Sequence, residues 1–202
     1  MNRQLAQFLS IVLHPVLMPT YALFFIFGNT TFLTFSTPDL VKKAIFYIVV
    51  INTLIFPVVI TYILYRTKVI QSFQMERREE RQVPYISNLL LLFVAAYLVH
   101  TLRLPALFFR LLLGAAASVM IALFVNFKWK ISIHMIGIGA LTGTLFGLTT
   151  LLAIDLRTAI VACFLVAGLL GTARLSLGAH QPMQIYAGFV VGFFCEYYFL
   201  GV

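Results

Sequence analysis

Seven apolar stretches along the 202-residue chain constrain its fold more than any other feature. Each is close to the ~20 residues that a helix needs to cross a hydrocarbon core about 30 Å thick. Only 10% of the residues are charged, against about 25% in soluble domains. We therefore expect an all-α polytopic membrane bundle of six to seven transmembrane helices, built as one integral membrane domain over residues 1–202. The predicted spans are 8–27, 43–65, 85–103, 105–127, 131–152, 156–172 and 181–200.

Prolines and glycines add local expectations to these spans. Pro105 and Pro182 suit first helical positions, where a missing N–H costs little, whereas Pro57 lies inside a span and predicts a kink. Small residues recur every four positions in two spans, which is typical of helices that pack closely in lipid. These residues are Gly139, Gly143 and Gly147 in the fifth span and Gly188 and Gly192 in the seventh.

Basic residues concentrate on one predicted face of the membrane. The net charge is +8, which in an apolar chain indicates anionic lipid or an anionic substrate rather than nucleic acid. Alternating spans put nine of the 14 bases on the face of the N-terminus, which the positive-inside rule makes cytoplasmic. We expect the bacterial inner (cytoplasmic) membrane, and a retained first helix rather than a cleaved signal peptide. The nine are Arg3, Arg66, Lys68, Arg77, Arg78, Arg81, Lys128, Lys130 and Arg174.

Two of the four histidines lie on this same face. His134 opens the fifth span, where Ser132 is predicted to cap the helix, and His180 precedes the seventh. Ionisable side chains inside apolar segments are functional candidates. Two helix N-termini, two histidines and Arg174 would then meet at one place that suits a phosphate group. His14 is expected to pack or to bond to the backbone, or to support these residues, and the cysteines act as small hydrophobes.

In these segments the chain resembles the type 2 phosphatidic acid phosphatase (PAP2) superfamily, whose motifs are K-x6-R-P, P-S-G-H and S-R-x5-H-x3-D. Arg174 to His180 reproduces R-x5-H, and Ser132-Ile-His134 retains part of the second motif. The first motif is the most divergent, because Glu76 and Val83 stand at its lysine and arginine positions before Pro84. The resemblance covers residues 66–192 and implies a PAP2-like helical core.

The resemblance also implies residue roles. His180 would be the nucleophile and His134 the acid that protonates the leaving alcohol, while Arg174 and Ser132 hold phosphate oxygens. One of Arg77, Arg78 and Arg81 would supply the charge that the first motif lacks. Gln184 occupies the position of the aspartate that orients the nucleophile. An amide accepts a hydrogen bond but does not stabilise an imidazolium as a carboxylate does, so a glutamate among Glu76, Glu79 and Glu80 is a candidate substitute.

Two main functions follow as expectations. The first is a metal-independent membrane phosphatase that acts on a lipid phosphate or isoprenoid diphosphate through a phosphohistidine, without any cofactor. The scarcity of acidic residues argues against a metal site, since Mg²⁺ needs clustered carboxylates. The alternative is a catalytically inactive relative that binds an anionic lipid as a carrier, scaffold or regulator. A small transporter is less favoured, because the sequence has no paired broken helices in two similar halves.

Overall fold

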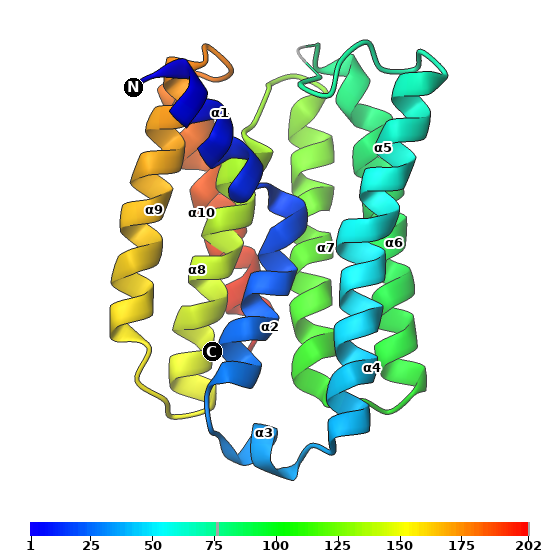
Figure 1. The fold of residues 1–202 in the computed structure, drawn as a ribbon, viewed down its shortest axis with the longest axis vertical. Coiled ribbons are helices and arrows are strands. Elements are labelled where there is room, and N and C mark those ends of the chain that lie inside the picture. Colours follow the sequence, from blue (N-terminus) through cyan, green and yellow to red (C-terminus); the bar gives the residue numbers. More distant parts are fainter. Residues whose placement is uncertain (76, 202) are drawn as a thin grey trace.

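The computed structural model describes residues 1–75 and 77–201, and no strand occurs in either range. The helices stand side by side as one bundle (Figure 1). In chain order they are α1 (Arg3–Val12), η1 (Pro15–Leu17), α2 (Met18–Gly28), α3 (Phe32–Ser36), α4 (Asp39–Val50), η2 (Ile51–Ile55), α5 (Phe56–Arg66), η3 (Glu79–Arg81), α6 (Gln82–Thr101), α7 (Ala106–Asn126), α8 (Ile133–Leu151), α9 (Arg157–Ser176) and α10 (Pro182–Phe199).

Six helical segments of the described chain are long and apolar enough to cross a membrane, which confirms the all-α polytopic bundle. They are Arg3–Gly28, Asp39–Arg66, Glu79–Thr101, Ala106–Asn126, Ile133–Leu151 and Arg157–Ser176. The seventh predicted span is α10, which packs along the bundle beside them but carries Gln184 and Glu196. Large apolar side chains such as Phe24, Leu165 and Tyr198 are exposed on the outer surface, as lipid contact requires.

The first two spans are interrupted. The prediction of one continuous helix over 8–27 is wrong, because α1 ends at Val12 and a 3-10 turn, η1, precedes α2. Pro15 and Pro19 lack the N–H groups that a continuous helix would use there. In the second span, where Pro57 predicts a kink, the π-helical turn η2 ends two residues before the proline and interrupts the α-helical pattern.

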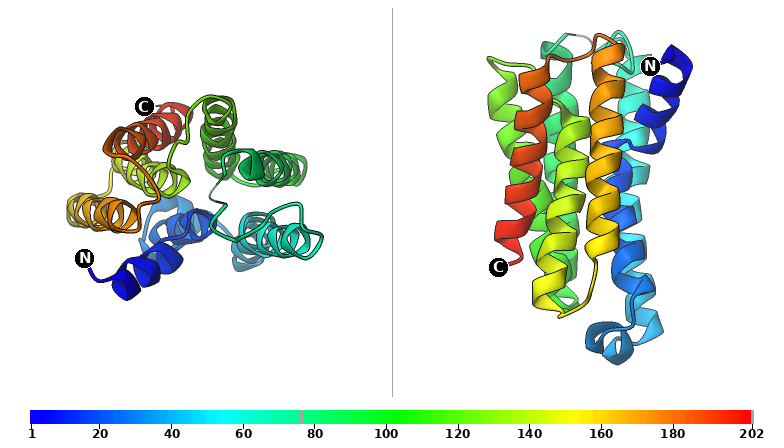
Figure 2. Two further views of the ribbon diagram at one scale, coloured as in Figure 1. Left: turned by 90° about the horizontal axis from the view of Figure 1, so that it is seen from above. Right: turned by 90° about the vertical axis from the view of Figure 1, so that its left-hand side faces the viewer.

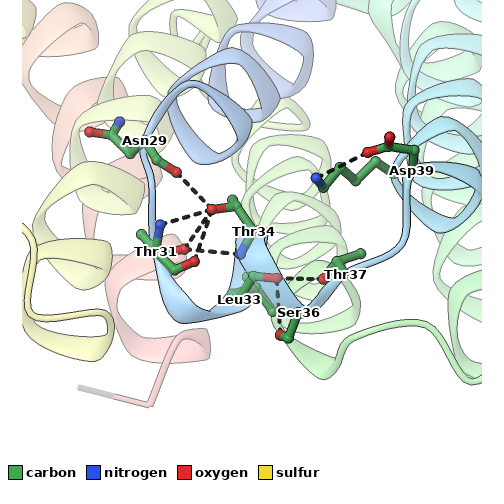
Figure 3. A network of polar contacts seen from close by, with 8 residues as sticks. Asn29, Thr31, Leu33, Thr34, Ser36, Thr37 and Asp39 are labelled. Carbon is green, nitrogen blue, oxygen red and sulfur yellow. Dashed lines mark hydrogen bonds and ion pairs between the residues drawn. The ribbon is translucent and has the colours of Figure 1, made fainter.

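Several helix boundaries differ from the sequence prediction. α4 begins at Asp39 rather than at residue 43, α7 has Pro105 as its N-cap rather than its first residue, and α9 continues to Ser176, so that Arg174 is helical. The connection before α4 contains the short helix α3 (Figure 3). There Thr31 and Thr34 form a reciprocal capping box, with their backbone N–H groups donating at 2.8 and 3.1 Å to the partner hydroxyl.

The central element is α8. About 72% of its apolar stretch is buried, against 28–39% in the other five membrane-crossing segments, and Figure 2 shows neighbours on several sides of it. The predicted close packing of α8 and α10 through glycines is confirmed, because a Cβ added at Gly139, Gly143 or Gly192 would collide with backbone of the facing helix. Such contacts are open only to residues without a side chain.

The loops sort onto two ends of the bundle as predicted. One end holds the N-terminus and the connections that follow α5, α7 and α9 (Figure 1). We call it the basic end. The connections that follow α2, α6 and α8 lie at the opposite end, and α10 runs from the basic end toward it. The histidine and arginine candidates therefore share one end of the molecule.

Candidate functional site

A cavity of about 120 Å³ lies at the basic end, which is many times the roughly 10–15 Å³ that one water requires. Its walls come from α5, α6, α8 and α9 and from the loops before η1, η3 and α10. We call it the arginine cavity. Its titratable lining residues are His14, Arg81, Tyr85, His134, Arg174 and His180. Four of the residues proposed from the sequence therefore line one space, namely Arg81, His134, Arg174 and His180.

A tight turn after α9 positions His180. Gly178 adopts a left-handed conformation with φ of 64°, which ends the helix as glycine commonly does. The N–H of Ala179 donates back to the carbonyl of Arg174 at 3.1 Å, which closes the turn. The five residues between Arg174 and His180 are thus the last helical turn and the loop that returns the chain to the cavity.

The contacts of His180 fix its tautomer. Its Nδ1 lies 3.1 Å from the side-chain oxygen of Gln184 and 3.3 Å from the backbone carbonyl of Lys130. Gln184 Oε1 also accepts the N–H of Gln181 at 3.1 Å, which sets the orientation of the amide. Both neighbours of Nδ1 are acceptors, so Nδ1 carries the hydrogen. The lone pair of the neutral ring is therefore on Nε2.

The surroundings of His180 favour the neutral imidazole. Burial lowers its pKa from 6.5 to about 4, and the positive charge of Arg81 acts in the same direction. The hydrogen bond to Gln184 opposes this shift, while Arg174 and Lys130 add to it. Near neutral pH the ring is uncharged, which is the protonation state of a nucleophile.

Ser10 of α1 joins His134 to Arg174. His134 Nε2 lies 3.1 Å from the Ser10 carbonyl oxygen, which only accepts, so Nε2 carries a hydrogen and Nδ1 has the lone pair. Arg174 donates from a terminal nitrogen to the Ser10 hydroxyl at 3.2 Å. The ring of His14 packs edge-on against His134 with centroids 5.1 Å apart. Residues from three distant parts of the chain thus meet at one wall.

Only Arg81 of the three candidate loop arginines lines the cavity. It is 5% exposed, and its guanidinium donates to the carbonyl oxygens of Met75 at 3.0 Å and Ile131 at 3.4 Å. Arg78 instead bonds to the Lys128 carbonyl and to Glu79 on the surface. Arg77 is exposed and is not among the residues that line the cavity. Of the three loop arginines, Arg81 is therefore the remaining candidate for binding phosphate together with Arg174.

The prediction for Ser132 is wrong in its local detail. Ser132 is the N-cap of α8, but its hydroxyl makes no capping bond and is buried with no partner among the described residues. Its N–H donates to the backbone carbonyl of Gln184 at 3.3 Å, and Ser132 does not line the cavity. The Ser132 N–H, which the motif would direct at phosphate, is therefore already bonded to α10. Ser132 links the N-terminal ends of α8 and α10.

No described carboxylate lines the arginine cavity. Glu79 pairs with Arg78 at 3.0 Å, and Glu80 accepts the N–H of Gln71 at 3.4 Å, both away from His180. Glu76 lies outside the described residues. Within residues 1–75 and 77–201, no cluster of three histidine, cysteine or acidic side chains is placed to hold a metal ion. Two guanidinium groups therefore share the cavity without a described counterion.

Two contributors were not identified from the sequence, because Ser10 was not considered and Tyr85 gave no motif signal, yet Tyr85 lines the cavity and Ser10 bonds to its walls. His14 was expected to pack or to bond to the backbone, and its ring packs against His134. No motif or spacing in the sequence marks Ser10 or Tyr85 as part of the site.

Comparison of the chain with protein-family models, with curated proteins and with solved structures finds no match. The resemblance to the PAP2 superfamily thus depends on the motif residues themselves, and functional reasoning proceeds from the geometry of the cavity.

Proposed function

We propose that this protein is a metal-independent membrane phosphatase that removes phosphate from a lipid phosphate or isoprenoid diphosphate. The observation that carries the proposal is the His180 ring, which lines the arginine cavity with its Nδ1 hydrogen held by two acceptors and its lone pair on Nε2. A neutral, oriented imidazole beside two arginines that have no described counterion is an arrangement that suits a phosphohistidine intermediate.

Arg81 and Arg174 would bind the phosphate. Phosphoryl transfer spreads charge over three oxygens, so fixed cations around them supply most of the stabilisation. Arg81 is already held by two carbonyls, and Arg174 by Ser10, so both are oriented before the ligand arrives. The cavity contains no described acidic side chain that would repel an anion.

The proposed chemistry has two steps. His180 Nε2 attacks the terminal phosphorus and the bond from that phosphorus to its ester or bridging oxygen breaks. The leaving oxygen, which belongs to a lipid alcohol or to a lipid monophosphate, takes a proton. His134 supplies this proton from Nδ1, which takes up a proton when the anionic head group enters. Nδ1 is the nitrogen involved because Nε2–H remains bonded to the Ser10 carbonyl. Water then attacks the phosphohistidine, giving its proton back to His134 and releasing inorganic phosphate. Splitting the reaction in this way needs no metal ion.

The test is release of inorganic phosphate by purified protein in detergent with a chelator present. Farnesyl phosphate and farnesyl diphosphate are the probes. We expect turnover by the native chain, none by His180→Ala and a reduction of at least a hundredfold in Arg174→Ala. Arg157→Ala is the matched control, since it removes an exposed arginine from the opposite end of the same helix. Equal turnover in all four proteins contradicts the proposal.

Anion binding without catalysis is the second candidate. Gln184 favours it, because the oxygen that orients His180 belongs to an amide rather than a carboxylate. In the analogous serine triad, replacing the orienting aspartate by its amide lowers kcat by about 10⁴-fold. Saturable binding of farnesyl phosphate that requires Arg174, together with no phosphate release and no phosphohistidine, supports this second function and excludes the first.

A further inference from the structure

A second cavity of about 110 Å³ lies deeper in the bundle, with walls from α2, η2, α6, α7, α8 and α10. We call it the midplane chamber. Most of its lining is aliphatic or aromatic, and no arginine, lysine or histidine of the described chain belongs to it. Its polar lining residues are Thr53, Asn88, Ser118, Thr144 and Glu196.

The midplane chamber adjoins the arginine cavity. Pro15, Val16, Asn88 and Ile133 line both spaces, so they share a wall at the break between α1 and α2. Glu196 follows Gln184 by 12 residues on α10, which puts it roughly 18 Å along the helix at 1.5 Å per residue. An apolar space therefore lies next to the arginine cavity, with Glu196 in its wall.

Glu196 is a buried acid in this apolar space. It is 4% exposed, and its Oε2 has no hydrogen-bond partner among residues 1–75 and 77–201. Gly114 on α7 makes room for the carboxyl, since a Cβ there would lie 2.7 Å from Oε2. The hydroxyl of Thr53, in the π-helical turn η2, is also buried with no partner in the described part of the chain. Unpaired polar groups inside a membrane are costly, so a ligand that bonds to them gains affinity.

From these features we propose that the midplane chamber binds a long-chain alcohol, with the alcohol hydroxyl hydrogen-bonded to Glu196. A hydroxyl both donates and accepts, which suits a carboxyl in either protonation state, and the hydrocarbon chain matches the apolar walls. A phosphate ester is excluded, because the chamber offers its charge no cation. The inference rests on the proposed function for the source of the alcohol, which is the product left when phosphate is removed.

Direct binding of tritiated farnesol to the purified, full-length protein tests this assignment without any turnover. We expect Glu196→Leu, which keeps the volume but removes the polar group, to weaken farnesol binding about tenfold, or 1.4 kcal/mol. Glu196→Gln retains a hydrogen-bonding group and is expected to bind within about threefold of the native chain. Binding of farnesyl phosphate should instead depend on Arg174. Farnesol affinity that is unchanged in Glu196→Leu overturns the assignment.

Chemical labelling of the native chain covers the case in which Glu196→Leu does not fold. Dicyclohexylcarbodiimide, an apolar reagent, modifies protonated carboxyl groups in membranes. We expect it to modify Glu196, and farnesol to slow the reaction at least fivefold while the hydrocarbon farnesene does not. Equal protection by farnesol and farnesene would mean that the chamber accepts any chain, which contradicts the hydroxyl assignment. Farnesol binding at Glu196 without phosphate release would contradict the proposed phosphatase function and leave the assignment of the midplane chamber intact.

Discussion

At position 184 an amide oxygen accepts the Nδ1 hydrogen of His180 at 3.1 Å, and the same oxygen also accepts a backbone N–H. The ring is therefore oriented, but the neutral amide offers no negative charge to stabilise the imidazolium that the proposed transfer would form. Gln184 thus orients the proposed nucleophile without strengthening it.

Gln184→Glu tests whether a charge at this position strengthens the nucleophile. Glutamate has the same length as glutamine, so its carboxylate keeps the hydrogen bond to His180 and stabilises the imidazolium, and we expect kcat for phosphate release to rise at least tenfold. Gln184→Leu keeps the bulk and removes the acceptor, and we expect kcat to fall at least tenfold. Steady-state phosphate release with farnesyl phosphate measures both. If both variants match the native rate, Gln184 does not orient the nucleophile.

Sequence reasoning reached the motif residues more readily than their supports. His134, Arg174 and His180 were predicted at one end because span counting fixes which loops share a face, and all three line the arginine cavity. The sequence did not indicate which of Arg77, Arg78 and Arg81 lines the cavity. The position of Arg81 depends on carbonyl acceptors from Met75 and from Ile131, which is distant in sequence. Ser10 was missed since a serine in an amphipathic helix carries no motif signal.

At the scale of helices, α8 and α10 form the closest pair. Gly139 and Gly143 on α8 face the backbone of α10, and Gly188 and Gly192 on α10 face that of α8. The recurrence of small residues was visible in the sequence, which is why this packing could be predicted. The break between α1 and α2 was not predicted, because its prolines lie inside an apolar run that reads as one span.

Gly192→Ala and Gly168→Ala make a matched pair for this packing. An added Cβ at Gly192 meets the Ile136 carbonyl, whereas one at Gly168 on α9 meets nothing within 4 Å. We expect Gly192→Ala to lower the thermal unfolding midpoint by several degrees, about 1–3 kcal/mol of overpacking. Gly168→Ala is expected to leave the midpoint unchanged or higher. Thermal unfolding in detergent measures both, and equal midpoints would contradict the assigned contact.

For the whole molecule, the order of loops on the two ends followed from counting spans, and the structure has that arrangement. Its orientation in a membrane stays a prediction. The basic end carries most of the bases, so the positive-inside rule makes that end cytoplasmic. The arginine cavity would then face the cytoplasm.

Thiol labelling of intact cells checks this orientation. In a chain with Cys163 and Cys195 replaced by alanine, we expect Ser36→Cys and Asp155→Cys to react with an impermeant maleimide. Gln71→Cys and Ser176→Cys should react only after the cells are permeabilised. These four residues are exposed, two at each end of the bundle. Labelling with the reverse pattern would place the basic end outside.

The position of α1 has a practical consequence for work on this protein. Ser10 and Arg174 are 164 residues apart in sequence but share a hydrogen bond, and the Ser10 carbonyl holds His134. An N-terminal fusion or truncation that displaces α1 would remove both Ser10 contacts and would therefore alter the positions of His134 and Arg174. Affinity tags are better placed away from the N-terminus, and an inactive preparation should first be checked for an intact α1.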